Sequence, residues 1–313
     1  MFLSLIFLLL ALLVVIKSAE FATRYASKLA ESFHLPKYVI GFLVVAVISI
    51  LPETFISVTS ALQGVPSLGL GTLFGSNVAD LTIVFALVVF LSGRKLKVES
   101  KVIKNQYLYI VMLALPLIFG MNGYYSKIEG LTLVISGILF YLYILRHSRV
   151  EVGRQKERFS PTDMICLLGS MALLLFGSQF TVEYALVLSN SLALDPLIIG
   201  VFIIGLGTVL PELSFSVRAA KEHSDGLALG DILGTVIADA TVVVGMMALI
   251  SPFAFDPRIV YITGGFMIVA LLFLLMFLRS GRVLTKKEAL LLCVFYAVFL
   301  VTELFLGVGV SGS

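Results

Sequence analysis

The run GFLVVAVISILPETFIS, residues 41–57, places a proline and a glutamate side by side in an otherwise apolar segment. A proline donates no backbone hydrogen bond and crowds the preceding turn, so it breaks a helix. A carboxylate in such a segment is costly unless a partner neutralises it. The stretch therefore predicts an interrupted helix with a buried acid, Glu53, at the interruption.

The composition indicates a membrane protein. Of the 313 residues, 59% are hydrophobic and 13% are charged, and the mean hydropathy is +1.09. A soluble domain of this length has too little interior to hide so much apolar surface. The apolar runs are about 20 residues long, which fits helices that cross a bilayer rather than the shorter, alternating strands of a barrel.

We expect ten membrane-spanning helices and an all-α polytopic fold. The first apolar run resembles a signal peptide, but it lacks a basic start and is counted as a span. The first and sixth runs are longer than a bilayer requires, so we expect them to be tilted or to extend into the interface. The ten runs are 2–32, 38–62, 68–92, 103–121, 127–146, 161–189, 197–221, 227–250, 259–279 and 287–307.

The basic residues predict the orientation. Lys and Arg gather in three of the loops that a ten-span count places on one side, at 94–104, 146–158 and 279–287. Loops on the opposite side, such as 63–67 and 189–196, contain no Lys or Arg. By the positive-inside rule, the basic loops are cytoplasmic and both termini are extracellular. We therefore expect a multi-pass protein of the cell membrane.

The chain also repeats itself. A shift of 159 residues aligns residues 41–84 with 200–243 without a gap, and about a third of the pairs are identical. Leu51-Pro52-Glu53 aligns with Leu210-Pro211-Glu212, and Ala79-Asp80 aligns with Ala238-Asp239. Each half then holds five spans, and because five is odd the second half is inverted in the membrane. We expect repeats at 1–146 and 161–313, joined by a basic cytoplasmic linker at 147–160.

Four acids recur at equivalent positions of the two halves: Glu53, Asp80, Glu212 and Asp239. An ionised acid deep in a bilayer is unfavourable, so we expect each to be protonated or bound to a cation. Proline removes a donor from the preceding turn and frees backbone carbonyls beside each glutamate. Carboxylates with carbonyls form an oxygen-only site that suits Ca²⁺, suits Mg²⁺ less and leaves Mn²⁺ open.

Other polar residues in the spans give weaker signals. Glycines four residues apart before Asp80 and Asp239 predict close helix packing. We expect Glu20, Glu183 and Glu303 to be solvated near the ends of spans. We expect Asp231 to lie at a helix N-terminus, where an anion is favoured.

The twice-repeated Leu-Pro-Glu, each followed by a glycine-containing turn and an acid, resembles the alpha repeats of the calcium/cation antiporter superfamily, and most closely the sodium/calcium exchangers. The resemblance covers essentially the whole chain. It implies ten helices in two inverted repeats and no enzymatic activity. It also implies that the first and sixth helices slide against the rest to give alternating access.

The resemblance implies a metal site without a cofactor. Carried over residue by residue, it makes Glu53 and Glu212 the Ca²⁺ ligands, together with the carbonyls of Ser49 and Thr208. It adds the acids of the third and eighth helices and the hydroxyls that precede them. The full set is Glu53, Glu212, Asp80, Asp239, Ser49, Thr208, Ser76 and Thr235.

Two departures from the family pattern bear on the counter-ion. Ile50 and Val209 stand where the family has serines that help to bind sodium, and Asp80 stands where it often has an asparagine. We expect exchange of Ca²⁺ for Na⁺, and the alternative is exchange of Ca²⁺ or another divalent cation for H⁺. With Ca²⁺ on the glutamates, Asp80 and Asp239 are expected to be protonated.

Two other classes remain open and are less favoured. An intramembrane aspartyl protease would use Asp80 and Asp239, but the nearest run to its glycine-rich motif is ALGD (228–231), and the repeated Leu-Pro-Glu has no role there. A cation channel would be slowed by four buried carboxylates that bind ions tightly. The expected partners are the transported cations and the lipid bilayer, with no nucleic acid and no protein partner.

Overall fold

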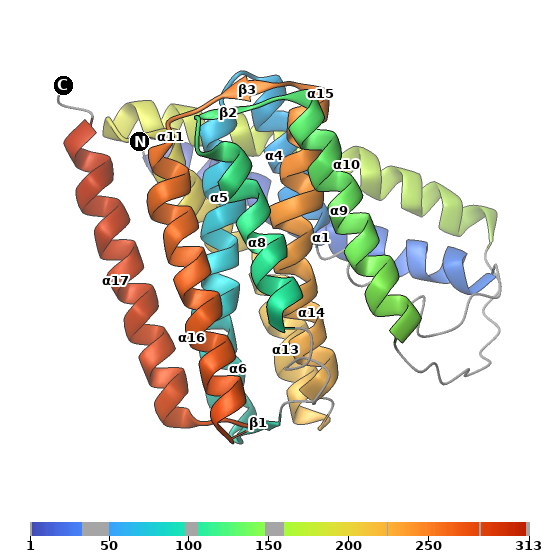
Figure 1. Ribbon diagram of the computed structural model, residues 1–313. Helices are drawn as coiled ribbons and strands as arrows, with labels where there is room; N and C mark the ends of the chain where they lie inside the picture. Colours follow the sequence, from blue (N-terminus) through green and yellow to red (C-terminus); the bar gives the residue numbers. More distant parts are fainter. Residues whose placement is uncertain are drawn as a thin grey trace.

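The computed structural model describes residues 2–32, 50–97, 106–147, 160–223, 225–281 and 283–310, and these residues are almost entirely helical (Figure 1). Eight of the described helical stretches are long and apolar enough to cross a membrane. A further apolar helix, Gln106–Gly120, is shorter, and the expected span at 38–62 is described only from residue 50. The polytopic helical fold is confirmed, whereas the count of ten spans stays a prediction.

The elements follow the expected order, with short π-helical segments (η) and four two-residue strands added. The first half contains α1 (Phe2–Ser32), α4 (Leu51–Leu62), α5 (Pro66–Ala79), η2 (Asp80–Val84), α6 (Phe85–Ser92), β1 (Leu96–Lys97), α8 (Gln106–Gly120), β2 (Tyr124–Tyr125) and α9 (Lys127–His147). The second half contains α10 (Pro161–Leu192), α11 (Pro196–Ile199), η3 (Gly200–Ile204), α12 (Gly205–Thr208), α13 (Leu210–Lys221), α14 (Asp225–Ala238), η4 (Asp239–Val243), α15 (Val244–Ile250), β3 (Phe253–Ala254), η5 (Val260–Gly264), α16 (Gly265–Gly281), β4 (Val283–Leu284) and α17 (Lys286–Val310).

Local sequence sets several helix ends. α10 begins with a capping box, in which the Ser160 hydroxyl accepts from the Asp163 backbone N–H and the Asp163 carboxylate accepts from the Ser160 N–H. Ser126 with Glu129 and Thr285 with Glu288 make the same reciprocal bonds at the starts of α9 and α17. α6 ends at Gly93, whose φ of 72° suits glycine.

The two strand pairs mark the opposite ends of the bundle. β1 pairs with β4 at one end, and β2 pairs with β3 at the other (Figure 1). Helix α6 therefore runs toward the β1–β4 end, whereas α15, its match in the second half, runs toward the β2–β3 end. Because β2 precedes α9 and β4 precedes α17, these two matched helices also start from opposite ends. Helices that align in sequence thus point in opposite directions.

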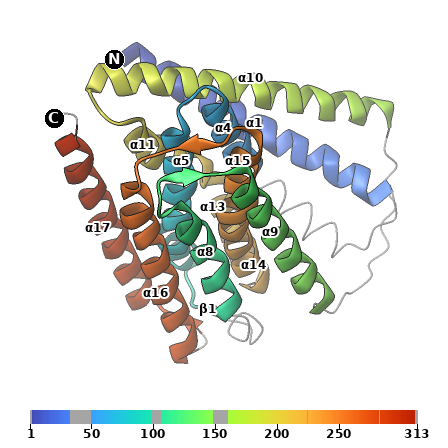
Figure 2. The same cartoon turned by 45° about the horizontal axis from the view of Figure 1, so that its top comes forward.

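Helices α1 and α10 form a separate pair. They pack along each other and run at a steep angle to the other helices, behind the bundle in the view of Figure 1 (Figures 1 and 2). Gly177 permits the contact, because a Cβ there would lie 2.9 Å from a Val15 methyl carbon. The two helices share an apolar cluster, which includes Leu12 of α1. The cluster also includes Ile204 of η3, in the segment that precedes the second Leu-Pro-Glu motif.

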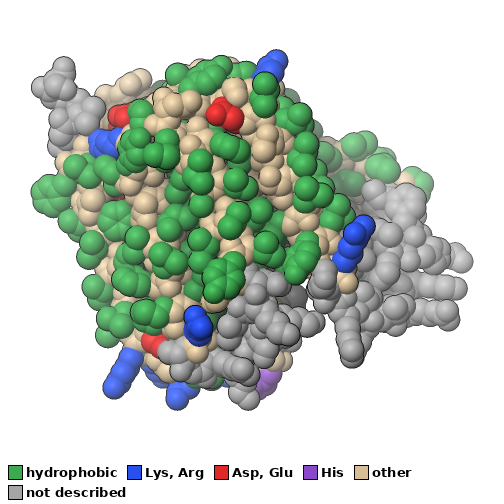
Figure 3. All heavy atoms as spheres, viewed as in Figure 1, with side chains coloured by type: hydrophobic (Ala, Val, Ile, Leu, Met, Phe, Trp, Pro, Cys, Tyr) green, Lys and Arg blue, Asp and Glu red, His purple; other side chains and the backbone are tan. Residues whose placement is uncertain are grey.

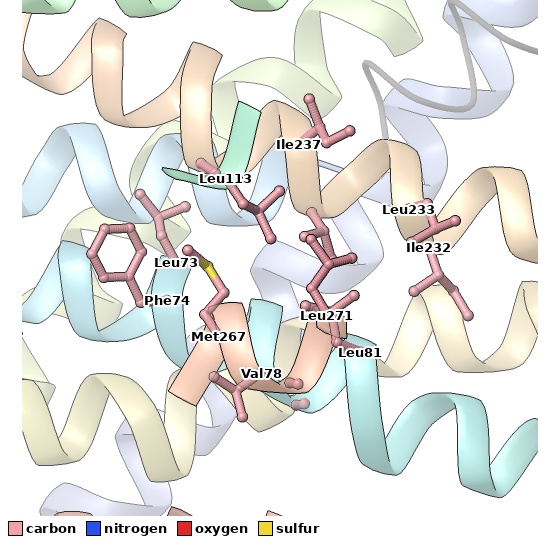
Figure 4. Packing of buried hydrophobic residues seen from close by; sticks show 14 of the residues in the cluster. Leu73, Phe74, Val78, Leu81, Leu113, Ile232, Leu233, Ile237, Met267 and Leu271 are labelled. Atoms are coloured by element: carbon pink, nitrogen blue, oxygen red, sulfur yellow. The ribbon is translucent and has the colours of Figure 1, made fainter. Parts of the chain in front are cut away.

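The core of the bundle joins both halves. Leu73, Val78 and Leu81 from the first half pack with Ile237 and Met267 from the second (Figure 4). Apolar side chains also cover the outside of the bundle, and charged ones gather mostly toward its ends (Figure 3). Arg94 and Lys95 lie beside β1, and Arg279, Lys286 and Lys287 lie beside β4, so these basic residues share one end.

Candidate cation site

Both Leu-Pro-Glu motifs start helices inside the bundle. α12 ends at Thr208, Val209 forms a turn, and α13 begins at Leu210 with Pro211 in its first turn. α4 likewise begins at Leu51, after a turn at Ile50, with Pro52 in its first turn. Proline is tolerated there because a first-turn N–H has no partner within its helix. The expected interruption is therefore a fresh helix start rather than a kink.

The two glutamates occupy these first turns. Glu53 and Glu212 are each only 1% exposed, and each lies at the positive N-terminal end of its half-helix, where a negative charge is stabilised. The Thr208 hydroxyl lies within hydrogen-bonding reach of the Glu53 carboxylate and donates to the Gly205 carbonyl at 3.2 Å. Thr208, just before the second Leu-Pro-Glu motif, thus lies next to Glu53 of the first motif.

The two aspartates mark π-helical segments. η2 begins at Asp80 and η4 begins at Asp239, 159 residues further on, and both side chains are fully buried. Single π-helical turns often lie at functional sites. The charges of Glu53 and Asp80 act on both Glu212 and Asp239, so the four acids share one electrostatic environment.

Most carboxylate oxygens of these acids have no hydrogen-bond partner among the described residues. This holds for both oxygens of Glu212, Asp80 and Asp239 and for one oxygen of Glu53. Buried polar atoms are normally satisfied, and an unpaired buried charge is strongly unfavourable. Oxygens left in this state fit cations or protons as their partners.

The expected hydroxyl ligands behave differently from one another. Ser76 donates to the Leu73 carbonyl of its own helix, whereas the Thr235 hydroxyl is buried and has no partner among the described residues. Ser49 lies outside the described residues. Within the part of the chain that the structure describes, no three His, Cys, Asp or Glu side chains group tightly enough for one ion. The four acids are therefore spread over neighbouring positions rather than gathered in one cage.

Hydrogen bonds at equivalent positions tie each half-helix to the helix that follows it. Ser57 donates to the Gly69 carbonyl at 3.3 Å, and Ser216 donates to the Ala228 carbonyl at 3.4 Å. Asn77 donates to the Val236 carbonyl at 3.3 Å, although the two residues are 159 positions apart. Equivalent positions therefore touch each other where α5 crosses α14.

Glycines bring α5 against the broken helix of the second half. A Cβ at Gly71 would lie 2.6 Å from the Leu197 carbonyl oxygen, and one at Gly75 would lie 2.9 Å from the Val201 Cα. From the other side, a Cβ at Gly200 would lie 2.5 Å from the Leu68 carbonyl oxygen. The close packing expected at Gly71 and Gly75 is confirmed, and it holds Thr208 beside the first half. The same expectation is wrong for Gly230 and Gly234, because a Cβ at Gly230 would meet no described atom within 4 Å and one at Gly234 would meet only the Tyr141 hydroxyl, at 4.0 Å.

Two acids do not lie where the sequence placed them. Asp231 is not at a helix N-terminus, because α14 begins at Asp225; it is 6% exposed and lies 3.4 Å from the Ser216 hydroxyl. Glu303 is not solvated but 1% exposed, and it accepts a hydrogen bond of 2.5 Å from Thr263 in η5. Neither acid has an acidic equivalent in the first half, so the repeat gave no signal for them.

Comparison with known proteins decides the family. The family described as sodium/calcium exchanger protein matches residues 3–146 and 162–305. The chain belongs to this family. Membership makes it a polytopic membrane protein and supports antiport of cations, including Ca²⁺.

Two relatives align with most of the chain. The putative antiporter CaxA of Alkalimonas amylolytica is 30% identical over 296 residues, covering 90% of this chain and 92% of CaxA. The sodium/calcium exchanger MaX1 of Methanosarcina acetivorans is 23% identical over 343 residues, covering 96% and 98%. These relatives are named as transporters rather than enzymes, which disfavours the aspartyl protease alternative.

A solved structure shares the fold. The sodium-calcium exchanger NCX_Mj, soaked with Na⁺ and Sr²⁺, superposes with a TM-score of 0.66 at 22% sequence identity, covering 95% of this chain and 97% of that one. At this identity the likeness concerns the fold alone. The protein thus shares the fold of an exchanger.

Proposed function

We propose that this protein is a secondary active antiporter that exchanges Ca²⁺ for Na⁺ at a site inside the membrane. One observation carries the proposal: Glu53 and Glu212 lie buried in the first turns of two half-helices, and three of their four oxygens have no described partner. Two carboxylates match the charge of one Ca²⁺. Oxygen ligands in an adaptable arrangement suit this ion better than the smaller Mg²⁺.

The remaining ligands are proposed from the helix breaks. From the sequence resemblance, the carbonyls of Thr208 and of Ser49, which lies outside the described residues, are proposed to supply neutral oxygens to the ion. The acids Asp80 and Asp239, with the hydroxyls of Ser76 and Thr235, form the flanking part of the site. Because these two acids sit at π-helical segments apart from the half-helix starts, we assign them to the counter-ion rather than to Ca²⁺.

We further propose that the chain is built from two inverted repeats of five helices, at 1–146 and 161–313, with a linker at 147–160. The opposite directions of matched helices support this division, as do the two stretches, 3–146 and 162–305, that match the family. The site then lies between the repeats, which is where transporters of this construction hold their substrates.

Exchange follows from charge. An empty site with several ionised carboxylates is unfavourable in the membrane interior. The site therefore becomes accessible from the other side of the membrane only after Ca²⁺ or counter-ions have neutralised its charge. Helices α1 and α10 are proposed to move together, because they pack on each other and share an apolar cluster largely of their own. Leu12 of α1 contacts Gly207 next to the break, which links this movement to the site.

A proton is the second candidate for the counter-ion, and two observations favour it. The side chains of Ile50 and Val209, 6% and 3% exposed, bring no hydroxyl to the half-helix starts. Asp80 and Asp239 are fully buried without described partners, and a carboxyl group in that state can carry a proton.

The two candidates are separated by flux measurements on purified protein in sealed liposomes loaded with Ca²⁺. An inward Na⁺ gradient at constant pH should drive Ca²⁺ efflux if Na⁺ is the counter-ion. If only an inward proton gradient in Na⁺-free buffer drives efflux, H⁺ replaces Na⁺ in the proposal. Absence of Ca²⁺ efflux under both gradients would contradict Ca²⁺ antiport itself.

A further inference from the structure

Asp231 breaks the symmetry between the two halves. Its equivalent in the first half, 159 residues earlier, is Thr72. Thr72 is buried and donates to the Leu68 carbonyl of its own helix at 2.9 Å. Asp231 is also buried, but its carboxylate lies 3.4 Å from Ser216 on α13, the half-helix that begins with Glu212. One half therefore carries an acid where the other carries a neutral, self-bonded hydroxyl.

The helix geometry places Asp231 between Glu212 and one end of the bundle. Arg94, beside β1, forms an ion pair with Asp225 at the start of α14, so α14 begins at the β1–β4 end. Asp231 is six residues further, about 9 Å along the axis. Glu212 is nine residues before the end of α13 at Lys221, about 14 Å from the same end. Asp231 is thus about one helical turn nearer to that end than Glu212.

The charge of Asp231 reaches the site. It acts on Glu212 and on Asp80, both of which have buried carboxylate oxygens without described partners. Ser216 lies one turn after Glu212 on the same face of α13 and bridges the two levels. Acids at successive depths attract a cation along one route and raise its local concentration. At the corresponding level from the β2–β3 end, the equivalent position carries the neutral Thr72.

We infer that Asp231 is a one-sided access residue, which draws Ca²⁺ toward Glu212 from the β1–β4 end and makes the apparent affinity higher on that face than on the other. The inference rests on the proposed Ca²⁺ antiport and deepens it. Asp231 acts here by its charge on the ion and need not be a ligand in the fully bound state.

The test measures the half-saturating Ca²⁺ concentration for exchange of radiolabelled Ca²⁺ against unlabelled Ca²⁺, separately on the two faces. Lys95 is exposed beside β1, so Lys95→Cys in a background without Cys166 and Cys293 marks that face for an impermeant biotin reagent. Streptavidin then separates liposomes by protein orientation. Self-exchange of Ca²⁺ makes the result independent of the counter-ion.

Asp231→Asn should raise the half-saturating Ca²⁺ concentration about tenfold on the β1–β4 face, the effect of one unit charge about 6 Å from a divalent ion in a water-like medium. On the β2–β3 face the change should stay within about twofold. Thr72→Asp is the reciprocal variant and should lower the half-saturating concentration on the β2–β3 face only. Thr72→Asp still tests the inference if Asp231→Asn does not fold.

Equal shifts on both faces, or no shift on either, would overturn the role of Asp231 while leaving Ca²⁺ antiport intact. If Asp231 had only a structural role, its replacement would change the amount of active protein, or the half-saturating Ca²⁺ concentration on both faces together. If the unaltered protein exchanges no Ca²⁺, the proposed function and this inference both fail, so the two failures are distinguishable.

Discussion

At the scale of single residues, the proposed site depends on buried acids, most of whose carboxylate oxygens have no partner among the described residues. Glu53 and Glu212 are stabilised by the N-terminal ends of their half-helices, and that stabilisation alone does not satisfy their oxygens. Asp80 and Asp239 lack even this support, because each lies in the middle of a continuous helical stretch. The proposal assigns Ca²⁺ to the first pair and the counter-ion to the second.

The glutamates are tested by neutral replacement. Glu53→Gln and Glu212→Gln should each reduce Ca²⁺ flux by at least about a hundredfold, since even residues that only support a metal ligand are worth 10–100-fold. Radiolabelled Ca²⁺ uptake into liposomes is the measurement. Glu183→Gln, at an exposed position of α10, is the matched control and should transport normally. Normal transport by either site variant would refute the assignment.

The aspartates are tested by separating two kinds of flux. The double replacement Asp80→Asn with Asp239→Asn removes charge and protonation sites from the flanking positions and leaves both glutamates in place. Exchange of Ca²⁺ for Ca²⁺ should stay within about threefold, and Ca²⁺ flux driven by the counter-ion gradient should fall at least about tenfold, because each removed carboxylate acts on the ion that it binds. Loss of both fluxes to the same extent would assign these acids to Ca²⁺ instead.

At the scale of elements, close backbone contacts hold the half-helices in place. α5 passes α11 and η3 with glycines on both sides of the contact, and Ser57 and Ser216 fasten each half-helix to the next helix. The glycine spacing at Gly71 and Gly75 predicted one side of this contact. The partner, Gly200 on η3, could not be predicted, because the π-helical turn that aims it at Leu68 forms only in the packed structure.

The contact predicts a stability difference between two glycines. Gly200→Ala should destabilise the folded protein by about 1–3 kcal/mol, since its Cβ would overlap the backbone of α5. Gly265→Ala in α16 is the control, because a Cβ there meets no described atom within 4 Å. Thermal unfolding of the two variants in the same detergent is the measurement. Equal melting temperatures would mean that α5 and η3 do not pack this closely.

At the scale of the whole molecule, much of the architecture could be predicted from the repeat. The long first and sixth helices and the helix starts at both Leu-Pro-Glu motifs appear as expected. The predicted positions of Asp231 and Glu303 were wrong, because each acid occurs in one half only and the repeat gives no signal for it. Their burial depends on how α14 meets α13 and how α17 meets η5, which no pattern along the chain encodes.

The orientation in the membrane is a prediction at this scale. Single cysteines at Gln63 or Asn122, both exposed, should react with an impermeant thiol reagent in intact cells. A cysteine at Lys95 should react only after the membrane is opened, because the basic β1–β4 end is expected to face the cytoplasm. The reverse labelling pattern would invert the proposed topology and would leave the cation site unchanged.

The most direct test of the central claim is a crystal structure of the protein soaked with Sr²⁺, which stands in for Ca²⁺ and scatters anomalously. We expect an anomalous peak in contact with the carboxylates of both Glu53 and Glu212, and loss of that peak in Glu212→Gln. A fully occupied peak that touches neither glutamate, or two glutamates turned away from each other with no ion between them, would contradict it.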